Sequence, residues 1–164
     1  MPSRLEYAID AIQDEFQNIT TANGYRNDLL SENVIRTIRH VAVIQTFPEI
    51  GIQSITCETV PLDSGWTLYE SHVEIRVAGR VKPYKDLTSD AVKMAEALDS
   101  LQHDMEKVMF VLCKKYKVDS TSPWIVQTGG WKVARNTVLS PSVGFGEIVV
   151  TFRIKLRNIS STFA

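Results

Sequence analysis

The sequence has no long apolar run, few cysteines and no surplus of either charge. No stretch approaches the roughly 18 consecutive apolar residues of a membrane-spanning helix, so we expect no membrane association. The only two cysteines, Cys57 and Cys113, lie far apart and outside any C-x-x-C or paired-histidine spacing. This pattern argues against a metal site or a disulfide framework. Both lie in apolar segments, and we expect buried free thiols in a reducing compartment.

The charge balance bears on possible partners. Eighteen Lys and Arg residues stand against nineteen Asp and Glu residues, which gives a formal net charge of −1. A strong sequence-independent nucleic-acid binder normally carries a basic surplus, so this class is disfavoured. The N-terminal sequence MPSRLEYAIDAIQDEF alternates charged and apolar residues and does not resemble a secretory signal. We expect a soluble intracellular protein, made without export, with residues 1–164 in one domain.

The first predicted helix begins at a capping box. Ser3 and Glu6 form an S-x-x-E pair, in which each side chain can satisfy a free backbone N–H of the first turn. The Asn-Gly pair at 23–24 is expected to end the helix, because glycine adopts the left-handed conformation without a Cβ clash. Tyr25 would then fold back on Ile19. The apolar stripe consists of Leu5, Ala8, Ile9, Ile12, Phe16 and Ile19.

Three extended segments follow this helix. Residues 32–44 are rich in β-branched side chains and predict a strand with imperfect alternation. Residues 52–60 predict a second strand, whose start is limited by Pro48, and residues 61–65 predict a turn. Residues 66–81 predict a long strand with one buried face and one wet face. The wet face carries Glu70, His72, Glu74, Arg76 and Arg80.

The second half is predicted to contain one long helix and two strands. Thr88 or Ser89 caps a helix of about 27 residues, on the order of 40 Å long, which follows a polar connector over 82–90. A strand over 124–134 contains a Gly-Gly bulge at 129–130, and a loop over 135–146 precedes a strand over 147–157. Residues 158–164 form a flexible tail. Segregated strands and helices indicate an α+β fold, an antiparallel or mixed sheet with two helices on one face.

No set of residues supports a reaction, a cofactor or a metal. His40 and His72 are placed in strands and His103 on the polar side of the second helix, none beside a partner in a catalytic pattern. The acidic groups at 14–15 and at 104–106 are interpreted as solvated helix surface. The glycines at 129–130 and 144–146 lead into strands, whereas a phosphate cradle leads into a helix. We therefore predict no catalytic, cofactor-binding or metal-binding residue.

Arg153, Lys155 and Arg157 share the wet face of the last strand. They form a potential positive stripe, but pairing with Glu70 and Glu74 of the long strand would explain both charge sets. The three tryptophans are not interleaved with basic residues, so we assign them to the core or to an interface. The residues concerned are Trp66, Trp124 and Trp131.

Two predicted strands, over 66–81 and 147–157, exceed the usual five or six residues. At about 3.3 Å per residue the second spans roughly 36 Å, which is more than one helix pair covers easily. Exposed strand ends invite pairing with another chain unless they are protected. The length of these strands is therefore typical of a subunit of an assembly.

Five segments, which together span nearly the whole chain, resemble the tail terminator (tail-completion) proteins of long-tailed bacteriophages. Of these, the TTANGY element is the most distinctive. The connector RNTVLSPSVGFG over 135–146 is a departure from the pattern of the family. The five segments are ITTANGY, FPEIGI, SHVEIRVAGRV, AEALDSLQHDMEKVM and GFGEIVVTFRIKLRN.

The resemblance implies a structural virion protein and no enzyme. Such proteins resemble small α+β subunits that close into a ring, usually six-fold, on the head-proximal end of the finished tail, after assembly in the host cytoplasm. The ring ends polymerisation of the major tail tube protein and offers a surface to the head–tail connector or neck protein. DNA passes through its lumen without specific binding. Six copies would carry 6 × (−1) = −6, and a strongly basic lumen would instead retain DNA.

Candidate contacts with a neighbouring subunit or the tube come from three places. The segment YRNDL over 25–29 either projects outward to a neighbour or forms a surface loop with Tyr25 as a helix staple. The wet strand faces and the 135–146 loop supply the others. The residues are Tyr25, Arg26, Asp28, Arg76, Arg80, Phe145, Arg153, Lys155 and Arg157. A neck or head-completion protein of the same virion, and a small hydrolase, remain the two alternatives.

Overall fold

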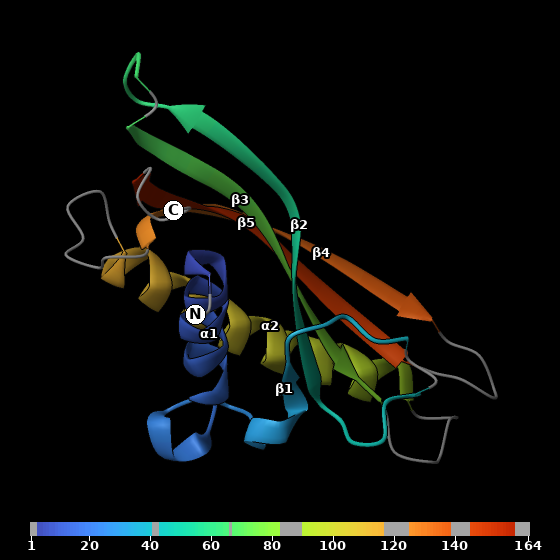
Figure 1. Cartoon of the computed structure of the whole chain (residues 1–164). Coiled ribbons are helices and arrows are strands. Elements are labelled where there is room, and N and C mark those ends of the chain that lie inside the picture. Colours follow the sequence, from blue (N-terminus) through green and yellow to red (C-terminus); the bar gives the residue numbers. More distant parts are fainter. Residues whose placement is uncertain are drawn as a thin grey trace.

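The computed structural model describes residues 3–40, 43–65, 67–82, 90–116, 125–138 and 145–159. It has the predicted α+β architecture, with a five-stranded mixed sheet in the order β1-β2-β3-β5-β4. Both helices pack on one face of this sheet, and no helix of the described ranges lies on the other face (Figure 1). The connector residues 83–89, the expected caps Thr88 and Ser89, and residues 118–123 lie outside the described residues.

The first helix, α1 (Arg4–Gln17), begins at the predicted capping box and ends earlier than expected. Its C-cap is Asn18, and a separate 3₁₀ turn, η1 (Thr21–Asn23), follows. Gly24 ends this turn with φ at 78°, so its left-handed conformation was predicted correctly and assigned to the wrong element. The helix stops because local side chains compete for its backbone: the Asn23 amide donates to the Asn18 carbonyl at 3.0 Å.

The second helix, α2 (Asp90–Lys115), has 26 residues and crosses the sheet as predicted (Figure 1). It lies close to β3 and β5 because two strand positions facing it are glycines. A Cβ on Gly79 would lie 2.5 Å from the Met105 sulfur, and one on Gly146 would lie 2.8 Å from Leu98 Cδ2. The core of the molecule lies between α2 and the sheet. Its fully buried members include Leu101, Met105, Val108, Met109, Leu112, Val150 and Ile154.

The expected strand over 32–44 is reduced to two residues. A 3₁₀ turn, η2 (Ser31–Asn33), leads into β1 (Val34–Ile35), which pairs parallel to β2 and makes the sheet mixed. After β1 the chain is drawn toward α1, because Arg36 pairs with Asp10 and donates to Gln13. It then passes over the sheet, where a Cβ on Gly51 would lie 2.4 Å from the Thr37 carbonyl oxygen.

The remaining strands are antiparallel; β2, β4 and β5 are longer than predicted, whereas β3 starts two residues later than predicted. They are β2 (Glu49–Pro61), β3 (Leu68–Val81), β4 (Ile125–Val138) and β5 (Phe145–Ile159). The expected loop over 135–146 is shorter, because 135–138 belong to β4 and 145–146 to β5, while 139–144 lie outside the described residues. Residues 158–159 belong to β5, so the expected tail starts no earlier than 160.

Extra residues interrupt the pairing of β2 once and of β4 twice, the first interruption of β4 lying between Ile125 and Gln127. The predicted bulge at Gly129-Gly130 is present, between the pairs Thr128–Ile154 and Trp131–Phe152. The irregularity in β2 leaves Ile55 without a partner in β3. An extra residue reverses which side chains face the core, so odd and even positions exchange faces within both strands.

The end of β2 extends beyond the helices. We call residues Gln53–Pro61 the β2 arm: Gln53–Thr59 are all exposed, whereas the four preceding residues of the strand are buried. Figure 1 shows the β2–β3 hairpin rising past both helices. Uncovered strands were expected over 66–81 and 147–157, but the described helix-facing positions of β3 and β5 are buried. The uncovered strand is β2, which the sequence did not single out.

Candidate subunit interface

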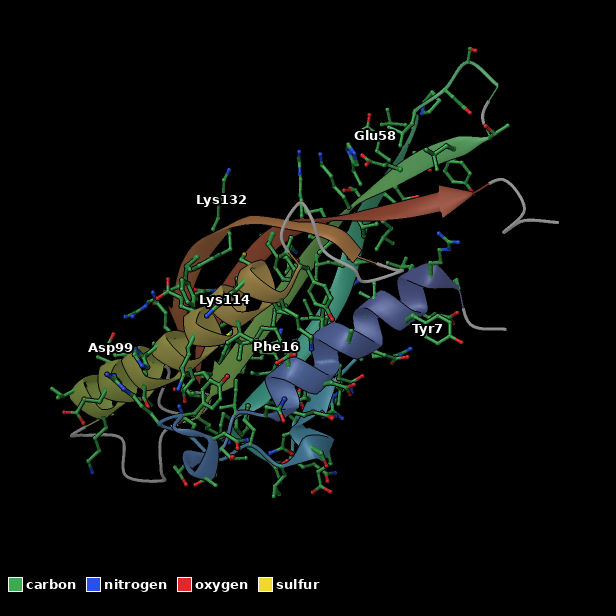
Figure 2. All side chains as sticks on the ribbon, turned by 90° about the vertical axis from the view of Figure 1, so that its left-hand side faces the viewer. Tyr7, Phe16, Glu58, Asp99, Lys114 and Lys132 are labelled. Atoms are coloured by element: carbon green, nitrogen blue, oxygen red, sulfur yellow. The ribbon has the colours of Figure 1, made fainter. Side chains whose placement is uncertain are left out.

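The face of the sheet opposite the helices, called here the outer face, is polar over most of its area. Strand register places its side chains from four strands side by side. Figure 2 shows Glu58 of β2 and Lys132 of β4 projecting from this face, away from the two helices. Its charged residues with described side chains are Glu58, Glu70, Glu74, Arg76, Lys132, Arg153 and Lys155, with Glu49, Arg80 and Glu147 at one end.

Opposite charges on the outer face lie across from each other, as the pairing interpretation predicted. Glu74 is opposite Arg153, with 3.5 Å between the carboxylate and the guanidinium Nε. Glu70 is opposite Arg157, whose side chain lies outside the described residues. Arg153 remains largely exposed, so its pair with Glu74 contributes little to stability. The face is therefore a mixed-charge surface rather than a purely positive stripe.

Arg80 does not lie on a wet surface, contrary to the prediction. Its side chain is about 7% exposed and donates to the Glu147 carboxylate at 2.7 Å and to the Arg39 carbonyl at 2.7 Å. Arg39 in turn pairs with Glu49, which is 1% exposed. The segment after β1 covers this end of the outer face, so the four charges form a partly enclosed network. Arg80 therefore holds this segment on the sheet and is not presented to a neighbour.

A hollow of about 740 Å³ lies on the outer face beside the β4 bulge. Gly129 and Gly130 line it, and a Cβ on Gly130 would meet open space. Its charged lining residues are Lys132, Arg153 and Glu74. The bulge thus makes the outer face concave near the β4 edge.

Tyr25, Arg26 and Asp28 lie on the helix side of the molecule, where their segment is fixed to α2. The Asp104 carboxylate accepts hydrogen bonds from the backbone N–H of Arg26 at 2.9 Å and of Asn27 at 2.8 Å, and from the Asn27 amide at 2.7 Å. Asp104 is fully buried, so its interpretation as solvated helix surface was wrong. Asp28 accepts from the Thr21 N–H at 2.6 Å.

The ring of Tyr25 packs on the hydrophobic core, and the Lys107 ammonium lies 4.3 Å from its centroid. Burial, together with the nearby charges of Glu15 and Asp104, raises the pKa of the Tyr25 hydroxyl above its ordinary value. Arg26 is exposed, and only its backbone N–H is bound to Asp104 by the contacts described above. These contacts favour the staple interpretation for Tyr25, and they leave Arg26 as the group able to reach another molecule.

The structure thus divides the predicted contact residues among three places. Arg76, Arg153 and Lys155 share the outer face, and Arg157 is placed there by register. Phe145 begins β5 opposite Val138, at the end of the sheet. The segment around Arg26 lies on the opposite side. Sequence reasoning missed the β2 edge and Lys132, because neither has a distinctive motif.

The three histidines lie in three different parts of the fold. His40 is exposed and follows β1 rather than lying in a strand, and His103 is exposed on α2, while His72 lies 3.2 Å from Glu70. Among the described residues, no three His, Cys, Asp or Glu side chains are grouped so that they could hold a metal ion. No helix in the described ranges is long and apolar enough to cross a membrane. Of the tryptophans, Trp131 packs partly buried on the core, and Trp66 and Trp124 lie outside the described residues.

The two cysteines are free, but they are not both buried as expected. Cys57 is exposed because it lies on the β2 arm, beyond the helices. Cys113 is half-buried, its thiol donates to the Gly129 carbonyl at 3.4 Å, and burial raises its pKa.

We expect a maleimide-type reagent to modify Cys57 well before Cys113 at pH 8. The thiolate is the reactive form. The raised pKa of Cys113 lowers its thiolate fraction, and its limited exposure hinders access of the reagent. Mass spectrometry of timed samples measures the order. In concentrated guanidinium chloride the two rates should become similar, and equal rates in the folded protein would contradict the placement of the β2 arm.

Comparison with known proteins leaves the family open. Neither a protein-family model nor a characterised protein matches this chain in sequence.

Proposed function

We propose that this protein is a tail terminator of a long-tailed bacteriophage, a structural subunit that closes into a ring on the head-proximal end of the tail. The observation that carries the proposal is the β2 arm. Seven consecutive residues of β2 are exposed, and the arm projects past the helices. A strand of this kind is unusual in a protein that acts alone, because an open edge pairs readily with other chains.

The charge distribution supports the same role. The outer face carries acidic and basic side chains in neighbouring pairs, and the formal net charge of the chain is −1. If the outer face lines the lumen, DNA passing through meets no continuous basic track to which it would adhere. The ring would cap the tail tube protein and present its other end to the connector or neck protein.

The main alternative is a neck or head-completion protein of the same virion. It would share the size, the charge and the tendency to form rings, so the partner distinguishes the two roles. A terminator binds tail tube protein and stops its polymerisation, whereas a neck protein binds the portal side. A small hydrolase would instead require a cluster of titratable groups with perturbed pKa values in a pocket. The described hollow contains Glu74, Lys132 and Arg153 without a nucleophile–base pair.

Light scattering after size-exclusion chromatography, followed by a tube-capping assay, tests the proposal. A six-fold ring has a mass of 6 × 18.5 = 111 kDa. We expect the protein to form this ring either in isolation, where light scattering gives its mass, or on the ends of tail tubes. We also expect tail tube protein polymerised together with the subunit to give shorter tubes, each with a ring at one end in negative stain. A heat-unfolded sample is the control for tube length. A strictly monomeric protein that leaves tube length unchanged would overturn the proposal.

A further inference from the structure

Both outer strands of the sheet have an open edge in the part of the chain that the structure describes. On β2, the only strand on the side away from β3 is β1, which pairs with Ile50 and Gly51 alone. The nine residues of the β2 arm, 53–61, therefore keep their outward backbone groups unpaired by a strand. On β4, no described strand pairs on the side away from β5. Beyond its bulge, β4 continues regularly for eight residues, Trp131–Val138.

We propose that the β2 arm of one copy pairs with the Trp131–Val138 edge of a second copy and extends the sheet from subunit to subunit. This inference rests on the proposed ring and names the surfaces that would form it. The two edges have nearly equal lengths. The strand directions also suit the pairing: β2 and β4 run in opposite directions within one sheet, so a rotated copy that keeps its strand direction places its β2 antiparallel to the β4 of its neighbour.

The charges of the two edges are complementary. The only charged residue of the β2 arm is Glu58, and Trp131–Val138 contains two, Lys132 and Arg135, both basic. The Arg135 guanidinium already forms an ion pair with the Asp99 carboxylate of α2, at 2.6 Å. Lys132 is exposed and projects from the same face as Glu58 (Figure 2). A charged side chain usually protects an edge strand from pairing with other strands. A second edge that carries the opposite charge at the position across from it would remove this protection, so the charges favour one specific neighbour.

The spacing of these two charges suits a closed ring. Within one copy, register through β3 and β5 places Glu58 level with Lys155, whereas Lys132 is level with Thr151. The offset along β5 is 155 − 151 = 4 residues, about 13 Å, and four strand spacings separate equivalent strands of adjacent copies by about 19 Å. Pairing Glu58 with Lys132 of the neighbour therefore requires a strand tilt of about 35°, within the range that closes a sheet into a barrel.

A charge reversal tests the contact. We expect Glu58→Lys and Lys132→Glu each to weaken ring formation about tenfold, because like charges would then face each other across the new strand pair. The double variant Glu58→Lys/Lys132→Glu should recover most of it. Glu96→Lys, a matched change on an exposed position of α2, should leave assembly unchanged. Thermal unfolding of each variant, with the melting temperature unchanged, confirms that folding is intact.

Disulfide trapping gives an independent measurement. Cys57 and Cys113 are first replaced by Ser, and Glu58→Cys and Lys132→Cys are then introduced together. Within one copy these positions are separated by three strand spacings, about 14 Å, and by the offset along the strands, too far for a disulfide. Mild oxidation should therefore give a ladder of covalent oligomers on a denaturing gel. Each single cysteine variant should remain monomeric.

The outcomes separate this inference from the proposed function. Rings that cap tubes but show no ladder and no effect of charge reversal would overturn the edge pairing and leave the terminator role intact. Dimers trapped by Glu58→Cys alone would also overturn it, because they would show two-fold pairing of β2 with β2. A protein that forms neither rings nor capped tubes would overturn both proposals.

Discussion

Replacing Arg80 with alanine is expected to lower the free energy of unfolding by about 3–5 kcal/mol, the range for breaking a buried ion pair from one side. The change leaves the Glu147 carboxylate without its partner at 2.7 Å and the Arg39 carbonyl without a donor. The segment after β1 would then lose its link to β3. Urea unfolding followed by circular dichroism measures the effect.

Two further variants distinguish a lost ion pair from a general effect of the substitution. Arg76→Ala removes an exposed arginine from the same strand and face, and should change stability by no more than about 0.5 kcal/mol. Arg80→Met combined with Glu147→Leu replaces both charges by apolar groups, and should recover much of the loss. An Arg80→Ala protein as stable as Arg76→Ala would show that the covering segment does not depend on this network.

Asp104→Ala is expected to cost about 3 kcal/mol, because a buried carboxylate that accepts three hydrogen bonds is removed. A hydrogen bond to a charged group contributes about 1.5–3 kcal/mol at most. The backbone N–H groups left without an acceptor add a desolvation cost, which becomes smaller if water enters the space left by the carboxylate. The amides of Arg26 and Asn27 should also exchange with solvent much faster. Hydrogen–deuterium exchange with peptide resolution detects this local opening.

A matched substitution on the same helix provides the reference. Asp99→Ala removes an exposed carboxylate that pairs with Arg135, and should cost less than about 1 kcal/mol without changing exchange at Arg26 and Asn27. Asp104→Asn keeps the shape of the side chain and one acceptor oxygen, so its loss should be intermediate. If Asp104→Ala unfolded no more easily than Asp99→Ala, the segment after Gly24 would be held by packing alone.

Periodicity predicts the regular elements of this fold and fails at local irregularities. The stripe of α2 and the alternation of β3 and β5 were sufficient to predict an α+β sheet with two helices on one face. The strand over 32–44 was overestimated because β-branched residues favour extension, whereas the chain leaves the strand pairing after Ile35, contacts α1 through Arg36 and then crosses the outer face. The extra residue at Ile55 exchanges faces within β2, and no sequence signal marks it.

The buried charges were the hardest part of the site to predict. Asp104 lies three residues after Leu101 and four before Val108, inside the apolar stripe of α2. That spacing was an available signal for burial, but its partners are backbone N–H groups 77 and 78 positions away in the sequence. Arg80 fits the wet-face alternation of β3, and only the covering segment makes it buried. The periodicity of α2 or of β3 alone does not show that a segment far away in the sequence will cover one of its polar residues.

The open edge of β2 also affects the subunit before it assembles. Its seven consecutive exposed residues carry one charge and no lysine, so newly made chains at high concentration can stack edge to edge in more than one geometry. Repeated head-to-tail contacts produce a closed circle only when the rotation per subunit divides a full turn, and otherwise grow into filaments. The curvature of the sheet, rather than the strength of the contact, would then determine whether a collection of these chains ends as a defined particle or as an indefinite fibre.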